Sequence, residues 1–170
     1  ILDLGTGSGV LALALANIFP SAQVVATDIS SDALELAQEN AATNKLSDKV
    51  GFHLGNWFEA LPTNEAAFDL IVSNPPYLSH QEWECTQQEV REHDPKLALV
   101  SENKGCDHLL DILTAAKQHL CPGGLLAMET GELHHEFLIE RAQETGLSNA
   151  SGMNDLSKKP RFFLAARPSR

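Results

Sequence analysis

Cysteine is scarce in this sequence, which contains three among 170 residues. Cys85, Cys106 and Cys121 are widely spaced, and no Cys-x-x-Cys pair occurs. This usage is typical of reduced cytosolic thiols and argues against a disulfide framework or a zinc site. The histidines are scattered as well, and the adjacent His134 and His135 would face different sides of a helix. We therefore predict a cytoplasmic location and no bound metal.

Long hydrophobic runs are also missing, since no apolar stretch approaches the ~20 residues that cross a membrane. The N-terminus has neither a basic start nor a small-residue cleavage site. The chain opens at Ile1, inside a predicted strand and without a methionine. We expect no membrane partner, and we expect the chain to be a piece of a longer protein.

Basic residues are few, with 12 Lys and Arg against 23 Asp and Glu, which gives a formal net charge of −11. A domain that binds nucleic acid through its own surface usually carries a basic stripe. Here basic residues cluster only near the C-terminus, at Lys158, Lys159 and Arg161. The composition therefore disfavours direct binding of nucleic acid.

Hydrophobic residues make up 43% of the chain, and its length suits a single domain with a sizeable core. Apolar runs of strand length alternate with stretches of helical periodicity, which predicts a doubly wound α/β fold with right-handed crossovers. The predicted strands are 1–4, 23–27, 50–54, 68–72, 125–128, 149–153 and 161–166. The predicted helices are 10–19, 32–42, 106–120 and 132–145.

The most informative stretch is Asn74-Pro75-Pro76-Tyr77, here called the Asn-Pro-Pro-Tyr loop, which follows the predicted strand 68–72. Each proline fixes its own φ and removes a backbone N–H, and it also keeps the preceding residue out of helical geometry. The Asn74 amide and the backbone carbonyls are therefore presented rigidly at the carboxyl end of a strand. Open α/β sheets bind ligands at that edge.

A second motif, Gly5-Thr6-Gly7-Ser8-Gly9, lies between the first strand and a helix predicted to be buried, and we call it the glycine loop. Strand, glycine turn and helix form the first half of a nucleotide-binding βαβ unit. The glycines let a ligand approach the backbone closely. The spacing differs from the dinucleotide pattern Gly-x-Gly-x-x-Gly, because Gly9 comes one position early. Asp3 precedes the loop and can either hold it or meet a cationic ligand group.

Two further strand ends carry candidate ligand contacts. Asp28 ends the second strand roughly 20 residues past the glycines, where a carboxylate can accept hydrogen bonds from both hydroxyls of a ribose. An alternative role as a helix N-cap is less needed, since Ser30 and Ser31 offer caps. After the third strand, Asn56 can bond the edge of a base while Trp57 or Phe58 lies against its ring. A surface turn with a core aromatic remains the alternative.

Residues 78–104 are the least regular part of the chain and are rich in glutamate. An irregular segment of this length between core elements is more often a lid or binding loop than filler. A solvated helix and loop would fit its composition equally well.

With these residues in place, the chain resembles class I S-adenosylmethionine-dependent methyltransferases. More narrowly, it resembles the HemK/PrmC family, which methylates the glutamine of the Gly-Gly-Gln motif in peptide chain release factors. Three segments carry the resemblance: the stretch from Asp3 through the glycine loop, the Asn-Pro-Pro-Tyr loop, and Val90-Arg91 with Asp94-Pro95 and Ala98-Leu99. The first segment is common to many methyltransferases. The second narrows the reaction to methylation of an amino-group nitrogen, and the third indicates that the substrate is a protein glutamine rather than a base.

The resemblance implies a Rossmann-like, mostly parallel seven-stranded sheet with an antiparallel last strand, in one catalytic domain covering residues 1–170. It also implies S-adenosylmethionine as cofactor, held by Gly5 to Gly9, Asp28, Trp57 and Asn74, and substrate contacts from Asn74, Pro75, Pro76 and Tyr77. Two departures are seen. Asp94 stands where the family usually has Glu, and the family's helical N-terminal domain for holding the release factor has no counterpart here.

We interpret the Asn74 side-chain oxygen and the Pro75 carbonyl as acceptors for the two N–H groups of the substrate amide, with Tyr77 as a pocket wall. Several alternatives remain open on the sequence. One alternative target is a glutamine of a ribosomal protein, and another is the amino group of a flipped DNA or RNA base. A dinucleotide oxidoreductase or a binding module without catalysis are more distant alternatives.

Overall fold

A computed structural model of the protein describes residues 1–62, 67–78 and 105–169. It contains a seven-stranded sheet in the order β3-β2-β1-β4-β5-β7-β6. The strands are β1 (Leu2–Leu4), β2 (Val24–Asp28), β3 (Val50–Leu54), β4 (Phe68–Ser73), β5 (Leu120–Glu129), β6 (Ser148–Asn154) and β7 (Pro160–Ala166).

The pairing of these strands confirms the predicted fold. β1 lies between β2 and β4 and is parallel to both, and β3 and β5 extend the parallel part on either side. β7, the last strand, is antiparallel to both β5 and β6. The chain is therefore a doubly wound sheet whose strand order turns back at β1 and β4, which is where such sheets bind ligands.

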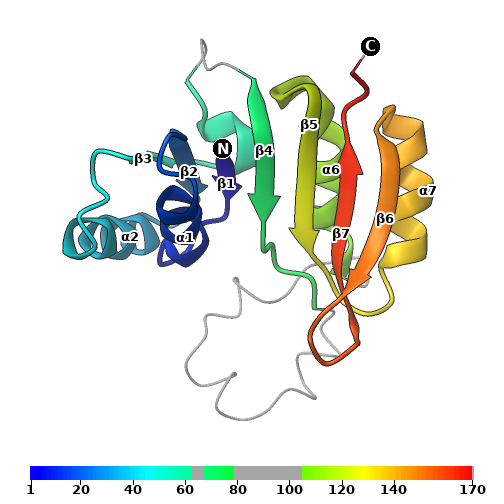
Figure 1. Ribbon diagram of the computed structural model, residues 1–170. Coiled ribbons are helices and arrows are strands. Elements are labelled where there is room, and N and C mark those ends of the chain that lie inside the picture. The colour runs from blue at the N-terminus through cyan, green and yellow to red at the C-terminus, as the bar shows by residue number, and fades with distance from the viewer. Residues whose placement is uncertain (63–66, 79–104, 170) are drawn as a thin grey trace.

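Helices cover both faces of the sheet (Figure 1). Around β1 to β3, helices α1 and α2 pack on one face, and behind β4 to β7, helices α6 and α7 pack on the other. Their bounds are α1 (Val10–Ile18), α2 (Ser31–Thr43), α6 (Asp107–His119) and α7 (His135–Thr145), with a 3-10 helix η1 (Trp57–Ala60) after β3. The larger core lies on the α6 and α7 side and includes Leu4, Ile71 and Phe163.

Local residues fix where two of the helices begin and end. Ser30 caps α2, because its hydroxyl oxygen accepts a hydrogen bond from the Ala33 amide at 3.2 Å. Gly146 ends α7 in the left-handed conformation, with φ of 74°, which glycine adopts without steric cost.

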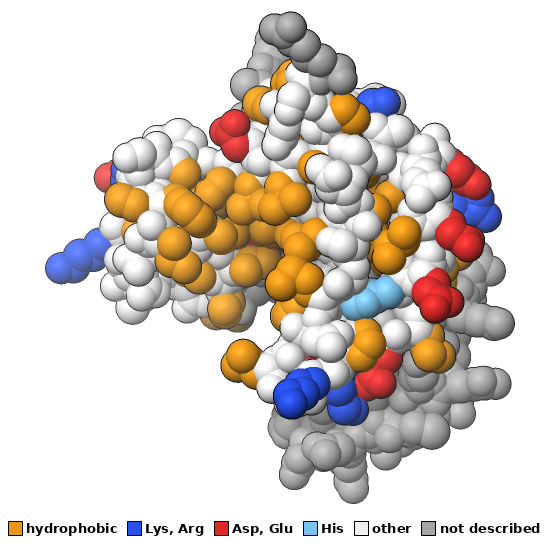
Figure 2. Space-filling view, turned by 45° about the vertical axis from the view of Figure 1, so that its right-hand side comes forward, with side chains coloured by type: hydrophobic (Ala, Val, Ile, Leu, Met, Phe, Trp, Pro, Cys, Tyr) orange, Lys and Arg blue, Asp and Glu red, His pale blue; other side chains and the backbone are white. Residues whose placement is uncertain are grey.

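Three expectations about these elements were wrong in detail. α1 is buried only along Ala12, Leu13 and Ala16, while Val10 is 71% and Ile18 64% exposed. Figure 2 shows hydrophobic side chains gathered on this side of the molecule. The residues of α1 are apolar nearly all round the helix, but the sheet covers only one side of it. The apolar side chains on the other side are therefore exposed.

The other two differences concern boundaries. β5 begins at Leu120 rather than at residue 125, because Leu120 already pairs with Phe68 of β4, and the amide of Gly123 and the carbonyl of Gly124 bond to Arg167. α7 begins at His135 rather than at residue 132. Within the described ranges, none of the helices has the length and apolar character that crossing a bilayer requires.

Candidate active site

The predicted site residues come together where β1, β2 and β4 end. Leu4, the last residue of β1, is in register with Thr27 of β2 and with Ser73 of β4. The glycine loop, Asp28 and Asn74 directly follow these three positions along the chain. The parallel register therefore brings the two sequence motifs to one edge of the sheet, as predicted.

The glycine loop turns sharply over that edge. Gly5, Gly7 and Gly9 have φ values of 69°, 56° and 83°, in the region that side chains disfavour. The amides of Gly5 and Thr6 both donate to the Thr27 carbonyl, each at 2.9 Å. A Cβ added at Gly7 would meet no heavy atom within 4 Å. The loop is thus tied down at its base and open above Gly7, which leaves room for a ligand against the backbone.

Asp3 holds this loop from below. One of its carboxylate oxygens accepts hydrogen bonds from the Thr6 hydroxyl at 2.6 Å and from the Ala12 amide at 3.1 Å. The second bond replaces the side-chain cap that Gly9 cannot supply at the start of α1. Asp3 is 1% exposed, and burial is the main reason why its pKa is raised to about 6. Of the two roles considered for Asp3, these contacts are those of loop support.

Asp28 joins the glycine loop to the turn that leads into α2. Its Oδ2 accepts a hydrogen bond from the Gly7 amide at 2.8 Å, and its Oδ1 accepts one from the Ser30 amide at 2.9 Å. Asp28 does not cap α2, because Ser30 does. Each carboxylate oxygen has a further lone pair, and the side chain is only partly buried. Asp28 can therefore accept further hydrogen bonds from a ligand beside the glycine loop.

The two aromatic residues after β3 lie in different places. A Cβ at Gly5 would come within 3.0 Å of the Trp57 ring, and that ring meets His108 edge-on at a centroid distance of 5.5 Å. Phe58 instead stacks on His119 at 4.4 Å. Trp57, which has a positive φ of 43°, is therefore the aromatic next to the glycine loop. Asn56 is exposed, and its contact with a base stays a prediction.

The Asn-Pro-Pro-Tyr loop leaves β4 with its polar group outward. Asn74 is exposed, Pro75 is buried, and Pro76 and Tyr77 are partly buried. The Tyr77 hydroxyl donates to Oε1 of Glu129 at 2.8 Å and accepts from Nη1 of Arg161 at 3.0 Å. Burial, followed by the Glu129 carboxylate, raises the pKa of Tyr77 to about 12. Tyr77 is thus a neutral side chain whose hydroxyl is held on both sides.

Comparison with known proteins identifies the family. The chain matches a methyltransferase domain over residues 1–160. It belongs to that family. A release factor glutamine methyltransferase of Xylella fastidiosa is 41% identical over 168 residues, which cover 99% of this chain and 60% of that protein. A ribosomal protein uL3 glutamine methyltransferase of Bordetella pertussis is 46% identical over 136 residues, covering 80% of this chain and 45% of that protein.

Among solved structures, a methyltransferase of Pyrococcus furiosus has a TM-score of 0.74 at 21% identity and covers 98% of this chain and 74% of that one. This likeness supports the fold of the methyltransferase domain. Similarity to several release factor glutamine methyltransferases confirms the predicted resemblance. The chain spans between 57% and 60% of the length of these relatives.

Glu129 and Arg161 are residues of this methyltransferase domain that the sequence did not single out for the site. Glu129 follows Tyr77 by 52 residues and Arg161 by 84. Neither lies in the glycine loop or the Asn-Pro-Pro-Tyr loop, and Arg161 stood out as part of a basic cluster and not as a site residue. Their contact with Tyr77 depends on β5 and β7 being neighbours in the sheet.

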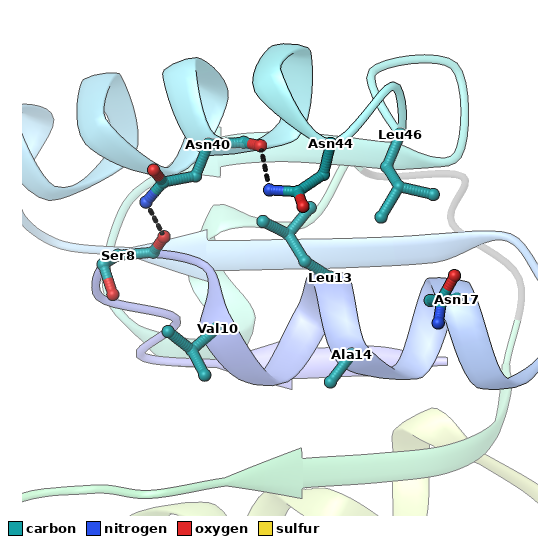
Figure 3. A pocket seen from close by; sticks show the side chains of 8 residues that line it. All are labelled: Ser8, Val10, Leu13, Ala14, Asn17, Asn40, Asn44 and Leu46. Carbon is teal, nitrogen blue, oxygen red and sulfur yellow. Dashed lines mark hydrogen bonds between the residues drawn. The ribbon is translucent and has the colours of Figure 1, made fainter.

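A hollow of about 480 Å³ lies between α1 and α2, as seen in Figure 3. Among the predicted site residues, Ser8 is the one that lines it, and its carbonyl accepts a hydrogen bond from Nδ2 of Asn40 at 2.9 Å. Asn40 in turn accepts at its carbonyl from the Asn44 side chain at 2.8 Å. These contacts support the glycine loop from the α2 side and point to a structural role.

The third predicted motif, with Val90-Arg91, Asp94-Pro95 and Ala98-Leu99, lies outside the described residues, as does most of the predicted lid 78–104. Among the residues that are described, there is no group of three or more His, Cys, Asp or Glu that could hold a metal ion.

Proposed function

We propose that this methyltransferase domain transfers a methyl group from S-adenosylmethionine to the side-chain amide nitrogen of the glutamine in the Gly-Gly-Gln motif of peptide chain release factors. The observation that carries the proposal is the position of the Asn-Pro-Pro-Tyr loop beside the glycine loop, on adjacent parallel strands. The names of relatives that are about 40% identical support the same substrate. We also propose that residues 1–170 act as one catalytic domain, within a longer protein that holds the substrate elsewhere.

The residues present fit S-adenosylmethionine. The glycine loop would hold the methionine part of this cofactor, because the backbone is open above Gly7. Asp28 offers carboxylate oxygens to the hydroxyls of a ribose, and Trp57 lies beside Gly5 at the edge where a base would rest. Asn74 would contribute a further contact from the β4 side, and Asn56 one to the edge of the base. When bound, this cofactor supplies an electrophilic methyl group on a sulfonium centre.

The protein's task toward the substrate is to position a weak nucleophile. The lone pair of an amide nitrogen is delocalised into its carbonyl, so the nitrogen reacts only when it is held and polarised. In the proposed mechanism, the Asn74 side-chain oxygen and the Pro75 carbonyl accept its two N–H groups. These acceptors favour the positive charge that develops as the nitrogen becomes pyramidal.

The remaining residues of the loop keep that geometry. Pro75 and Pro76 limit backbone movement through their fixed φ angles. Tyr77 would form one wall of the pocket, and positioning would supply most of the acceleration. The substrate proton can leave to water after methyl transfer, so the mechanism requires no dedicated base.

A glutamine of ribosomal protein uL3 is a second candidate substrate. The observation that favours it is the 46% identity to a uL3 glutamine methyltransferase, which exceeds the identity to the release factor enzymes. The same acceptors would grip either glutamine, because only the side-chain amide is held in the mechanism. An amino group of a DNA or RNA base is less well supported, since the net charge is −11.

The test presents the full-length protein with isotopically labelled S-adenosylmethionine and three substrates: a release factor, uL3, and total RNA with DNA. Mass spectrometry of each product should locate one added methyl on the Gly-Gly-Gln glutamine of the release factor. A release factor with that glutamine replaced by alanine serves as the control and should stay unlabelled. Label on uL3 alone would establish the second candidate, and label on nucleic acid would overturn both.

The predicted cytoplasmic location stays a prediction.

A further inference from the structure

The Tyr77 hydroxyl is clamped between two charged residues from the far half of the sheet. Glu129 is the last residue of β5, and Arg161 is near the start of the neighbouring strand β7. Tyr77 donates its only O–H to Glu129 and accepts a hydrogen bond from Arg161. Hydrogen bonds to ionised groups are stronger and more directional than neutral ones. The far end of the Tyr77 ring is therefore fixed across the β5–β7 pair.

The backbone and the ring of Tyr77 each lie close to a glycine. Gly105, with φ of 84°, lies so close that a Cβ there would overlap the Tyr77 carbonyl oxygen. A Cβ at Gly131 would lie 3.6 Å from the edge of the Tyr77 ring. Tyr77 therefore has close neighbours outside the Asn-Pro-Pro-Tyr loop at its backbone and at its ring, and it is hydrogen-bonded at its hydroxyl.

Arg161 has its own supports. Its Nε lies 3.7 Å from Oδ2 of Asp155, and its backbone carbonyl accepts a hydrogen bond from the Thr130 amide at 2.8 Å. Asp155 is fixed in turn, because its Oδ1 accepts from the amides of Ser157 at 2.8 Å and Lys159 at 3.0 Å. The clamp on Tyr77 thus belongs to a connected network that includes the β6–β7 hairpin.

We propose that Glu129 and Arg161 are positioning residues for methyl transfer, which act on Asn74 by holding Tyr77. This inference rests on the proposed function. Only Pro75 and Pro76 separate Tyr77 from Asn74, and their fixed φ angles make the segment stiff. Holding Tyr77 therefore sets the direction of the Asn74 oxygen and the Pro75 carbonyl. Small displacements of a reacting group reduce rates by as much as ~10²-fold.

The test compares Glu129→Ala with Glu132→Ala in the full-length protein. Glu132 is a matched control, because it lies three residues further on and forms an exposed ion pair with Lys159. With a release factor as substrate, Glu129→Ala should lower kcat by roughly 10- to 100-fold, while the KM for S-adenosylmethionine changes by less than about threefold. Glu129→Gln keeps an acceptor oxygen and should recover most of the rate. Glu132→Ala should match the wild type.

A second readout does not depend on turnover. Tyr77 is the only tyrosine in the 170-residue chain, so tyrosine labelled with carbon-13 gives a signal that Tyr77→Phe assigns. Replacing Glu129 should shift this ring signal at neutral pH and lower the pKa of Tyr77 from about 12 toward its usual value, because the carboxylate no longer opposes ionisation. Arg161→Gln should displace the same signal, and Glu132→Ala should leave it in place.

The outcomes separate the two hypotheses. A wild-type protein that methylates neither release factor nor uL3 refutes the proposed function. The positioning role of Glu129 and Arg161 in that reaction is then refuted as well. An active wild type with an equally fast Glu129→Ala variant overturns the positioning role alone, whether or not the tyrosine signal moves. Loss of kcat with an unmoved tyrosine signal also overturns it, since Glu129 would then act by another route.

Discussion

The glycine loop and the Asn-Pro-Pro-Tyr loop meet at one edge of the sheet, yet they are held in different ways. The glycine loop is flexible by composition, and the hydrogen bonds that it donates to Asp3, Thr27 and Asp28 hold it from beneath. The Asn-Pro-Pro-Tyr loop is stiff by composition, and its Tyr77 end is bonded to residues of the distant strands β5 and β7. The first arrangement leaves a backbone surface open for a ligand. The second leaves the side-chain amide of Asn74 exposed at the end of β4.

This difference suggests a division of work, in which the glycine loop binds cofactor and the Asn-Pro-Pro-Tyr loop carries the chemistry. Substitutions in the first loop should then change affinity and stability. Substitutions in the second should change the rate of transfer.

Asn74→Ala should lower kcat for methyl transfer by at least ~10²-fold, because it removes one of the two proposed acceptors of the substrate amide. Cofactor affinity, measured by calorimetry, should stay within a few-fold of the wild type. Asn17→Ala removes the same group from an exposed position near the end of α1 and should have no effect on rate. Near-normal turnover by Asn74→Ala would refute the catalytic role of this residue.

Asp28→Asn should raise the Kd for S-adenosylmethionine by roughly 10- to 100-fold, since hydrogen bonds to a carboxylate are worth more than those to a neutral amide. The value of kcat at saturating cofactor should fall much less. Asp32→Asn, on the exposed first turn of α2, is the matched control. Equal Kd values for the two variants would remove Asp28 from the cofactor site.

The contrast between the loops also explains what the sequence could predict. The glycine loop, Asp28 and the Asn-Pro-Pro-Tyr loop each follow a strand directly, so the alternation of elements was enough to bring them together. Asp3 was harder, because the choice between holding the loop and meeting a ligand depends on burial. Burial follows from packing across the sheet, which no local pattern contains.

Trp57 and Phe58 show a second limit of sequence reasoning. They are adjacent aromatics after the same strand, and the sequence does not tell which ring lies beside Gly5; in the structure it is Trp57, whose φ is positive. Glu129 and Arg161 show a third limit. Their role depends on the register between β5 and β7, in which Glu129 pairs with Phe162. An antiparallel register of this kind is fixed by the assembled sheet and not by the nearby residues.

Gly7→Ala and Gly9→Ala should separate binding from stability within the glycine loop. Both residues have positive φ, so each substitution costs about 1 kcal/mol of folding free energy. A Cβ at Gly9 would also lie 3.0 Å from the Cβ of Ala37, which adds about 1 kcal/mol for the tighter packing of α1 on α2. Gly7→Ala should instead weaken cofactor binding more, because its Cβ enters the open side of the loop.

Urea unfolding and calorimetry on both glycine variants measure these two quantities. Gly9→Ala should show the larger loss of unfolding free energy, and Gly7→Ala the larger rise in Kd. If one variant showed both the larger loss of unfolding free energy and the larger rise in Kd, the difference between a packed Gly9 and an open Gly7 would be contradicted.

Asp3 should make the stability of the glycine loop depend on pH. Burial raises the pKa of its carboxyl from 3.8 to about 6, so the folded protein keeps a proton that the unfolded chain releases. The unfolding free energy of the wild type should therefore fall, relative to Asp3→Asn, as the pH rises through this interval. Between about pH 5 and pH 7 the relative loss should be about 1 kcal/mol.

Urea unfolding at several pH values, with Asp32→Asn as an exposed control, measures this slope. The control should keep the wild-type dependence, while Asp3→Asn should lack the part that comes from the buried carboxyl. Parallel curves for the wild type and Asp3→Asn would show that Asp3 titrates as it does in water. The Asn-Pro-Pro-Tyr loop should add nothing over this interval, because the pKa of Tyr77 is raised to about 12. Of these two loops, the glycine loop should then respond to pH near neutrality through Asp3, and the Asn-Pro-Pro-Tyr loop should not respond through Tyr77.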